Sequence, residues 1–274
     1  MTAASHLVPY GPAVDALTVN LLIAAAVTVA CLVASWITRE YSWVDRLWSV
    51  VPVAYAWVFA AAADEPRVTL MAALITAWGI RLTLNFARRG GYAPGGEDYR
   101  WAVLRERLPG WRFQVFNVLF IALYQNAILL AITLPAWTAS EHPRPLGGAD
   151  VVAATLFVLL LAGETLADQQ RWDFHKAGRP GVLDTGLYRV SRHPNYVCEV
   201  GQWWVVFAFG AIAAGTVWLP TVAGAALLTL LFVGSTLFTE QITASRHPEF
   251  AAYKRSTPMF VGPPRRPRPE AAEA

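Results

Sequence analysis

The sequence has few charged residues and few cysteines, and it lacks the common nucleotide-binding and hydrolase signatures. Only 15% of its 274 residues are charged, which is too few for an ordinary soluble domain of this length. Its two cysteines, Cys31 and Cys198, offer neither a disulfide framework nor a metal-ligand spacing, so we expect no metal site. The patterns G-x-G-x-x-G, Walker A, H-E-x-x-H and G-x-S-x-G are all missing. A bound dinucleotide would therefore not be held by a Rossmann fold.

Apolar residues make up 55% of the chain and come in blocks near the length that crosses a bilayer. They predict an all-α, polytopic integral membrane protein with about seven transmembrane helices, at roughly 17–37, 47–63, 67–87, 114–136, 151–169, 200–213 and 217–239. The N-terminus has no basic region before its first apolar block, so no cleavable signal peptide is expected. We expect one transmembrane catalytic domain over 1–262 and a disordered, proline-rich cytoplasmic tail over 263–274.

The basic residues are distributed very unevenly between the two ends of these predicted spans. With the N-terminus outside and the C-terminus inside, 20 of the 22 Lys and Arg residues lie on the cytoplasmic side, and only Arg67 and Arg144 lie outside. This asymmetry predicts the orientation and explains the pI near 9.0 without nucleic acid. We expect membrane lipids as neighbours, no nucleic acid partner and a monomer.

The most informative motif begins at Arg192-His193-Pro194 and continues into an apolar stretch. Proline suits the first turn of a helix, where its missing N–H costs nothing. A helix N-terminus beside Arg and His attracts anions, and Asn195 and Glu199 lie four residues apart on one face. The motif predicts a polar pocket for an anionic ligand. The alternative is an ordinary interfacial helix start with a snorkelling arginine.

A second polar stripe closes the fifth predicted span. Glu164, Asp168, Arg171 and His175 follow helical spacing and share one face. They suit a ligand with ribose hydroxyls and phosphates. The alternative is an ion pair between Asp168 and Arg171 that ends the helix.

Other polar residues lie near predicted span ends. Asp45 either caps the second span or points inward, and Arg81 lies deep enough in the third span to need a partner. Residues 124–126 suit hydrogen bonds between helices. Residues 97–108 predict an amphipathic surface helix, and residues 246–255 suit either a similar helix or a binding role.

Together these motifs resemble the steroid 5α-reductase superfamily, most closely over 164–260 and more weakly over 40–90. In that family a polar residue and an Asp four positions apart precede an Arg, and Glu164, Asp168 and Arg171 match this pattern. An Asn-x-x-Gly-Glu motif follows a Gly-Leu-aromatic stretch. It matches Asn195 to Glu199, with Cys198 in place of the glycine.

The resemblance implies a seven-helix fold in the bacterial plasma membrane, with a cytoplasm-facing site for NADPH and hydride transfer to the C=C bond of a lipophilic enone. It assigns catalysis to Asp45, Trp78 and Glu199. It assigns substrate contact to Trp43, Asp45, Trp48, Trp78 and Tyr124. It assigns cofactor contact to Arg81, Asn85, Arg88, Arg89, Glu164, Asp168, Arg171, Lys176, Tyr188, Arg192, His193, Asn195, Tyr196, Glu199, Glu240, Tyr253 and Lys254.

Two other functions compete with this one. The run from Arg192 to Tyr196 also resembles the isoprenylcysteine carboxyl methyltransferases and phospholipid methyltransferases, which use S-adenosylmethionine. NADPH is a polyanion that favours several Arg or Lys residues, and Asn195, Glu199 and the Glu164–Arg171 stripe favour the reductase. A non-catalytic lipid-binding or transport protein would also carry intramembrane polar groups. However, broken helices in matching halves are not evident.

Overall fold

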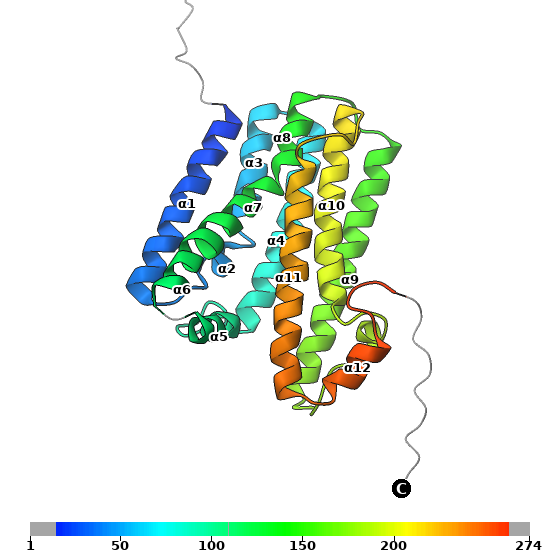
Figure 1. Cartoon of the computed structure of the whole chain (residues 1–274). Coiled ribbons are helices and arrows are strands. Elements are labelled where there is room, and N and C mark those ends of the chain that lie inside the picture. Colours follow the sequence, from blue (N-terminus) through cyan, green and yellow to red (C-terminus); the bar gives the residue numbers. More distant parts are fainter. Residues whose placement is uncertain (1–14, 109, 263–274) are drawn as a thin grey trace, which may run out of the picture.

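The computed structural model describes residues 15–108 and 110–262, so the predicted tail at 263–274 lies outside the described residues. All of the regular structure in this part of the chain is helical, which confirms the all-α prediction. The first half runs through α1 (Ala16–Thr38), α2 (Trp43–Leu47), α3 (Val51–Ala63), α4 (Pro66–Arg88) and α5 (Tyr99–Arg107). Figure 1 shows α1, α3 and α4 running along the bundle, with α2 and α5 near one end.

The second half begins with a long composite helix made of α6 (Trp111–Phe116), the π-helix η1 (Asn117–Tyr124), α7 (Gln125–Ala131) and α8 (Leu134–Glu141). It continues with α9 (Gly148–Lys176), the short 3₁₀ helix η2 (Gly186–Arg189), α10 (Pro194–Ala214), α11 (Val222–Arg246) and α12 (Phe250–Ser256). Helix α10 packs mainly on α9 and α8 and also contacts α11. We call the end of the bundle that carries α5 and α12 the basic end.

Six helices are long and apolar enough to cross a membrane, by length and composition: Ala16–Thr38, Pro66–Arg88, Trp111–Glu141, Gly148–Lys176, Pro194–Ala214 and Val222–Arg246. Large apolar side chains on these helices face outward, for example Leu22 on α1 and Leu159 on α9, each more than 60% exposed. An outward apolar surface of this kind suits lipid rather than water. The chain is therefore a polytopic membrane protein with six candidate spans.

The predicted second span is shorter than expected. Helix α3 covers 13 residues, or about 20 Å at 1.5 Å per residue, whereas a hydrocarbon core is about 30 Å thick. The chain turns over residues 48–50, and α3 starts afresh with Pro52 in its first turn. The earlier part of the predicted span belongs to α2, which places Asp45 inside that short helix and not at the cap of α3. The capping interpretation of Asp45 is therefore wrong.

The fourth predicted span contains an irregularity that the sequence did not indicate. Residues 117–124 form a π-helix, a rare form that often occurs at functional sites. Along this segment Phe116 stacks on Phe120 with ring centroids 4.8 Å apart, and Phe120 stacks on Tyr124 at 5.3 Å. The three rings make one continuous aromatic wall.

A buried ion pair fastens the bundle at the end opposite the basic end. The Arg67 guanidinium donates to Asp150 at 2.7 and 3.0 Å and also to the carbonyls of Arg144 and Pro145. Asp150 in turn accepts from the backbone N–H of Gly147, at the start of α9. Both charged side chains are almost fully buried. The pair therefore fixes α4 against α9 at one end and leaves the other end for the site described next.

Candidate functional site

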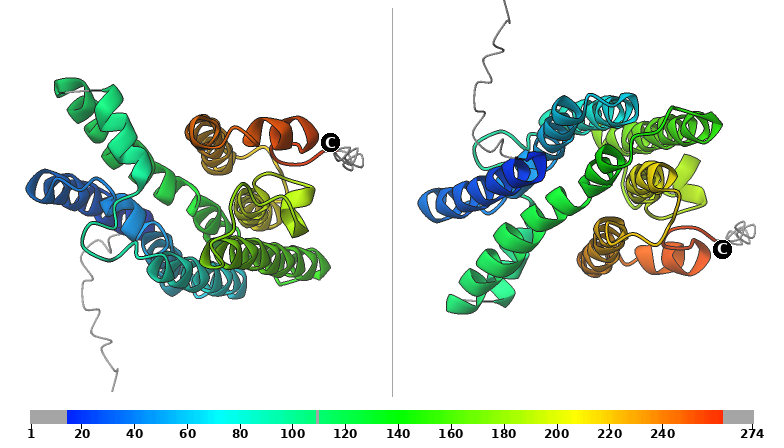
Figure 2. Two further views of the ribbon diagram at one scale, coloured as in Figure 1. Left: turned by 90° about the horizontal axis from the view of Figure 1, so that it is seen from below. Right: turned by 90° about the horizontal axis from the view of Figure 1, so that it is seen from above.

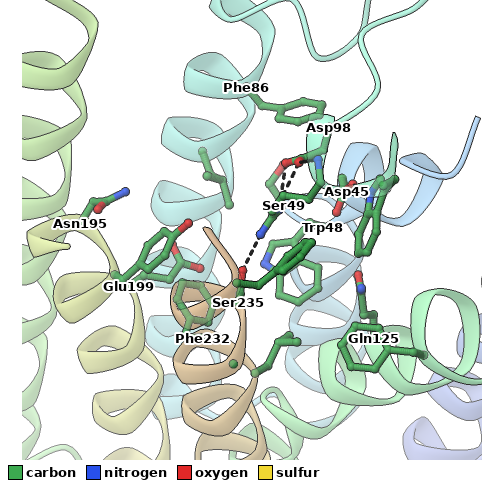
Figure 3. A pocket seen from close by; sticks show the side chains of 18 of the residues that line it. Asp45, Trp48, Ser49, Phe86, Asp98, Gln125, Asn195, Glu199, Phe232 and Ser235 are labelled. Carbon is green, nitrogen blue, oxygen red and sulfur yellow. Dashed lines mark hydrogen bonds and ion pairs between the residues drawn. The ribbon is translucent and has the colours of Figure 1, made fainter. Parts of the chain in front are cut away.

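A cavity of about 490 Å³ lies inside the basic half of the bundle, within the usual range for small-molecule sites. Its walls come from α2, α4, α5, α6, η1, α7, α9, α10 and α11. One side, the polar end, is lined by Asn85, Glu164, Asp168, Asn195 and Glu199. The other, the aromatic chamber, is lined by Trp48, Trp101, Phe116, Phe120, Tyr124, Phe232 and Phe238. Figure 3 shows Asn195 and Glu199 on one side of the cavity, and Asp45 and Gln125 on the other.

One guanidinium organises the polar end from behind the cavity wall. Arg81 donates to Asp168 at 2.6 Å and to Glu164, and its Nη2 lies 3.7 Å from Glu199. Asn85, one turn further along α4, donates to the same Asp168 oxygen at 2.7 Å. The prediction that Arg81 needs a partner is confirmed, whereas Asp168 pairs across to α4 and not with Arg171 on its own helix. Three carboxylates thus meet one guanidinium, which leaves acceptor oxygens in excess.

Helix α10 supplies the other side of the polar end. Its predicted start at Pro194 is confirmed, and that start places Asn195 within 3.3 Å of Asp168. Glu199 accepts from Trp78 Nε1 at 3.1 Å through one oxygen, while its other oxygen has no hydrogen-bond partner among the described residues. The Glu199 side chain lines the cavity, and this unpaired oxygen is the candidate acceptor for a ligand.

Several polar groups interrupt the aromatic chamber, among them Asp45 and Gln125. Asp45 accepts from Trp101 Nε1 at 2.8 Å, and burial raises the pKa of this carboxyl above its usual value. Gln125 is 3% exposed, lines the cavity, and makes no side-chain hydrogen bond with any described residue. An apolar pocket with a few polar groups orients a lipophilic molecule by its polar atom. Asp45 and Gln125 are suited to that role.

A set of predicted cofactor ligands forms a different structure, which we call the C-terminal latch. Glu240 on α11 accepts from Arg192 at 2.7 and 3.1 Å, from His193 at 3.1 Å and from Lys254 at 3.2 Å. Arg192 also donates to the carbonyls of Lys254 and Thr257, at 3.1 and 2.5 Å. These charges satisfy one another. They hold the chain after α11 against the start of α10.

Tyr253 completes the latch by donating to the Tyr188 carbonyl at 2.5 Å. Arg192 is 8% exposed, so the interpretation of this motif as a snorkelling arginine at an ordinary interfacial helix start is wrong. Burial raises the pKa of Tyr188 to about 12. None of the latch residues lines the cavity, so their predicted contact with a cofactor stays a prediction.

Two arginines near the polar end have no such internal partner. Arg89 lines the cavity, and neither it nor Arg171 makes a hydrogen bond or ion pair with a described residue. Desolvation, and then repulsion from Arg171, lower the pKa of Arg89. By contrast, Arg88 donates to Asn85 and Gln169. These two cations repel each other, and Asp168 attracts both without a direct ion pair to either, so they suit a polyanionic ligand.

A family model and a curated relative each match most of this chain. The model of a family described as a protein of unknown function, DUF1295, matches residues 31–257. The chain belongs to the DUF1295 family. An uncharacterized protein of Schizosaccharomyces pombe is 34% identical over 256 residues, which cover 83% of this chain and 74% of that protein. No solved structure matches.

In this DUF1295 protein the structure brings many predicted site residues together. Those that line the cavity are Asp45, Trp48, Asn85, Arg89, Tyr124, Glu164, Asp168, Asn195, Tyr196 and Glu199. Two others, Arg81 and Trp78, lie just behind its wall and bond to its carboxylates. The cavity lining does not include Trp43, Arg88, Arg171, Lys176 or the latch residues Tyr188, Arg192, His193, Glu240, Tyr253 and Lys254.

Sequence reasoning about the DUF1295 chain missed two parts of the cavity. The first is α5, whose amphipathic character is confirmed but whose Arg100 and Trp101 face the cavity. The second is the wall of α11, including Ser235 and Phe238. The four-residue spacing from Phe116 to Tyr124 was a usable signal for the aromatic wall. Nothing in the apolar sequence of α11 shows which face meets a cavity.

Proposed function

We propose that this protein is an NADPH-dependent membrane reductase that transfers hydride to the C=C bond of an enone in a lipophilic substrate. One observation carries the proposal. A single cavity joins a polar end with unfilled acceptors to an aromatic chamber, and the unpaired Arg89 and Arg171 lie beside the polar end. The resemblance to the steroid 5α-reductase superfamily rests on residues in this same region.

The residues present fit the cofactor. Arg89 and Arg171 would hold phosphates, because neither guanidinium forms a direct ion pair with a carboxylate of the described residues. Glu164 and Asp168 would accept from ribose hydroxyls. Asn195 and Glu199 would meet the nicotinamide amide, for which Glu199 keeps a free oxygen. When bound, NADPH would supply the hydride, and the protein would position the reactants.

The aromatic chamber would receive the substrate. Asp45 is the candidate donor to the substrate carbonyl, because burial raises its pKa and so favours the protonated form. The double bond would gain hydride at its β-carbon and one proton at its α-carbon. Trp78 is fully buried and bonded to Glu199, so we assign it to positioning that carboxylate. The aromatic wall would exclude water from the hydride.

The test is a thermal-shift series on the full chain purified in detergent, with NADPH, NADH and S-adenosylmethionine side by side. We expect NADPH to raise the Tm, since a ligand at about 100 times its Kd stabilises by about 2.7 kcal/mol. The double variant Arg89→Gln/Arg171→Gln should lose most of that shift. The control Arg179→Gln, an exposed arginine that does not line the cavity, should keep it.

The methyltransferase remains the second candidate for a specific reason. Three carboxyl groups around one guanidinium leave acceptor oxygens in excess, and such a site also suits the sulfonium of S-adenosylmethionine. Stabilisation by S-adenosylmethionine alone would overturn the reductase proposal.

A further inference from the structure

The aromatic chamber extends to the side of α11 that faces outward. Leu230 and Gly234 both line the cavity, yet Leu230 is 64% exposed and Gly234 is exposed too. Helix α11 is one of the six candidate spans, so lipid would cover this part of its surface. Residues that line a cavity and also face lipid mark the rim of an opening in the side of the bundle.

The neighbouring elements define the edges of this opening. Helix α11 packs against α7 and α10, and beyond Arg246 it leads into α12. Figure 2 shows α6 and its continuation diverging from α11 in both views, so the facing walls are α11 and η1. Toward the basic end the gap is closed by α5. There Arg100 donates to Ser235 at 2.5 Å, and Arg107 lies over the Phe238 ring at 5.2 Å.

Gly234 lies on this rim and has open space beside it. A Cβ added to it would meet no heavy atom within 4 Å, so close packing does not explain the glycine. Glycine is also among the poorest helix formers, and this one lies in the middle of a 25-residue helix. A larger side chain on this face would project into the space between α11 and the Phe116–Phe120 wall. The missing side chain keeps that space open.

We propose that the opening is a lateral portal for a lipid and that Gly234 sets the width of the lipid that passes. The occupant would be a membrane lipid with a polar oxygen at its leading end. The chamber inside is aromatic, and the polar residues on the side of α2 and α7 include Asp45, Ser49 and Gln125 (Figure 3). The identification of this lipid as the substrate rests on the proposed function, but the portal itself does not.

The test uses the full chain in phosphatidylcholine vesicles that carry palmitic acid with a mid-chain diazirine as photoreactive probe. After illumination, mass spectrometry of the peptides should find adducts on 116–124 and 230–238. Gly234→Phe should reduce labelling inside the chamber at least about tenfold, as expected when a pocket is blocked. Gly234→Ala should change it by no more than about twofold.

The matched control is Leu237→Phe, which adds an aromatic ring to an exposed position of α11 that does not line the cavity. It should label like the wild type. Circular dichroism must show native helix content in each variant. If a folded Gly234→Phe variant labels the chamber as strongly as the wild type, or if adducts lie only on other surfaces, the portal is refuted.

The NADPH thermal shift separates this inference from the proposed function. Gly234→Phe should keep the full shift, because the residues that would hold NADPH belong to α9, α10 and the end of α4 and none of them lies on α11. If NADPH leaves the Tm of the wild-type protein unchanged but the probe labels the chamber as described, the reductase proposal is refuted and the portal is supported. An intact NADPH shift with labelling that does not depend on residue 234 would refute the portal alone.

Discussion

Replacing Arg81 by methionine should be among the most destabilising single changes in the basic half of the bundle. The Arg81 side chain is 11% exposed, and its guanidinium lies within ion-pair distance of Glu164, Asp168 and Glu199. Methionine has a similar volume but no charge, so the variant leaves three buried carboxylates without a cation. Removing one partner of a buried ion pair costs about 3–5 kcal/mol. We expect a loss of that size in the free energy of unfolding.

The assay is unfolding by sodium dodecyl sulfate in mixed micelles, followed by circular dichroism. Arg81→Lys should lose less, about 1–3 kcal/mol, because an ammonium keeps the charge but not the planar fork that reaches two carboxylates. The control is Arg105→Met. Arg105 pairs with Glu97 at 2.6 Å but is 35% exposed, so its loss should be at most about 1 kcal/mol.

A double variant tests whether unpaired charge causes the loss of stability. Adding Asp168→Asn to Arg81→Met removes one of the stranded charges, so part of the lost stability should return. If Arg81→Met costs no more than Arg105→Met, or if Asp168→Asn lowers the stability of Arg81→Met further, the polar end is not organised by charge in the way described.

Three further predictions concern other parts of the bundle. Arg67→Met should lower the free energy of unfolding by about 3–5 kcal/mol in the same assay, because it leaves the buried Asp150 without a cation. Trp78→Phe should lower the free energy of unfolding by about 1.5–3 kcal/mol, because the Glu199 carboxylate loses the hydrogen bond from the indole N–H. It should also weaken the NADPH thermal shift, although Trp78 does not line the cavity. Burial lowers the pKa of His193 below its usual value of 6.5. The unfolded chain therefore binds this proton more tightly, and stability should fall as the pH drops below 6.5.

Each of these has a result that would count against it. For Arg67, a loss no greater than that of an exposed pair would contradict the fastening role. For Trp78, an unchanged NADPH shift would show that the orientation of Glu199 does not depend on the indole. For the pH effect, His193→Gln should flatten the decline between pH 6.5 and 5, and an unchanged slope would assign it to another group.

The sequence predicts the outline of this fold well and its interior only in part. Long apolar runs identify spans because an apolar segment of this length is favourable in a bilayer whichever helices pack beside it. The helix start at Pro194 follows from local chemistry. Arg81 was expected to need a partner because a lone charge in a span is costly. Such arguments concern one segment at a time.

What the sequence could not supply is how segments meet. The pairing of Arg81 with Glu164 and Asp168 joins positions more than 80 residues apart, and no local pattern indicates it. The same holds for Arg192, which looks available for an anion in the sequence but binds Glu240 in the structure. The π-helix has no known local signal, because it differs from an α-helix only in the register of its hydrogen bonds.

The C-terminal latch shows how a chain can keep a fixed geometry while its sequence changes. Two of the contacts that Arg192 makes are with backbone carbonyls, those of Lys254 and Thr257. Every residue type offers a carbonyl, so these contacts are indifferent to the side chains at both positions. The segment is constrained in shape and in length but only weakly in composition. Among relatives, insertions or deletions between α11 and residue 257 should therefore be rarer than substitutions there.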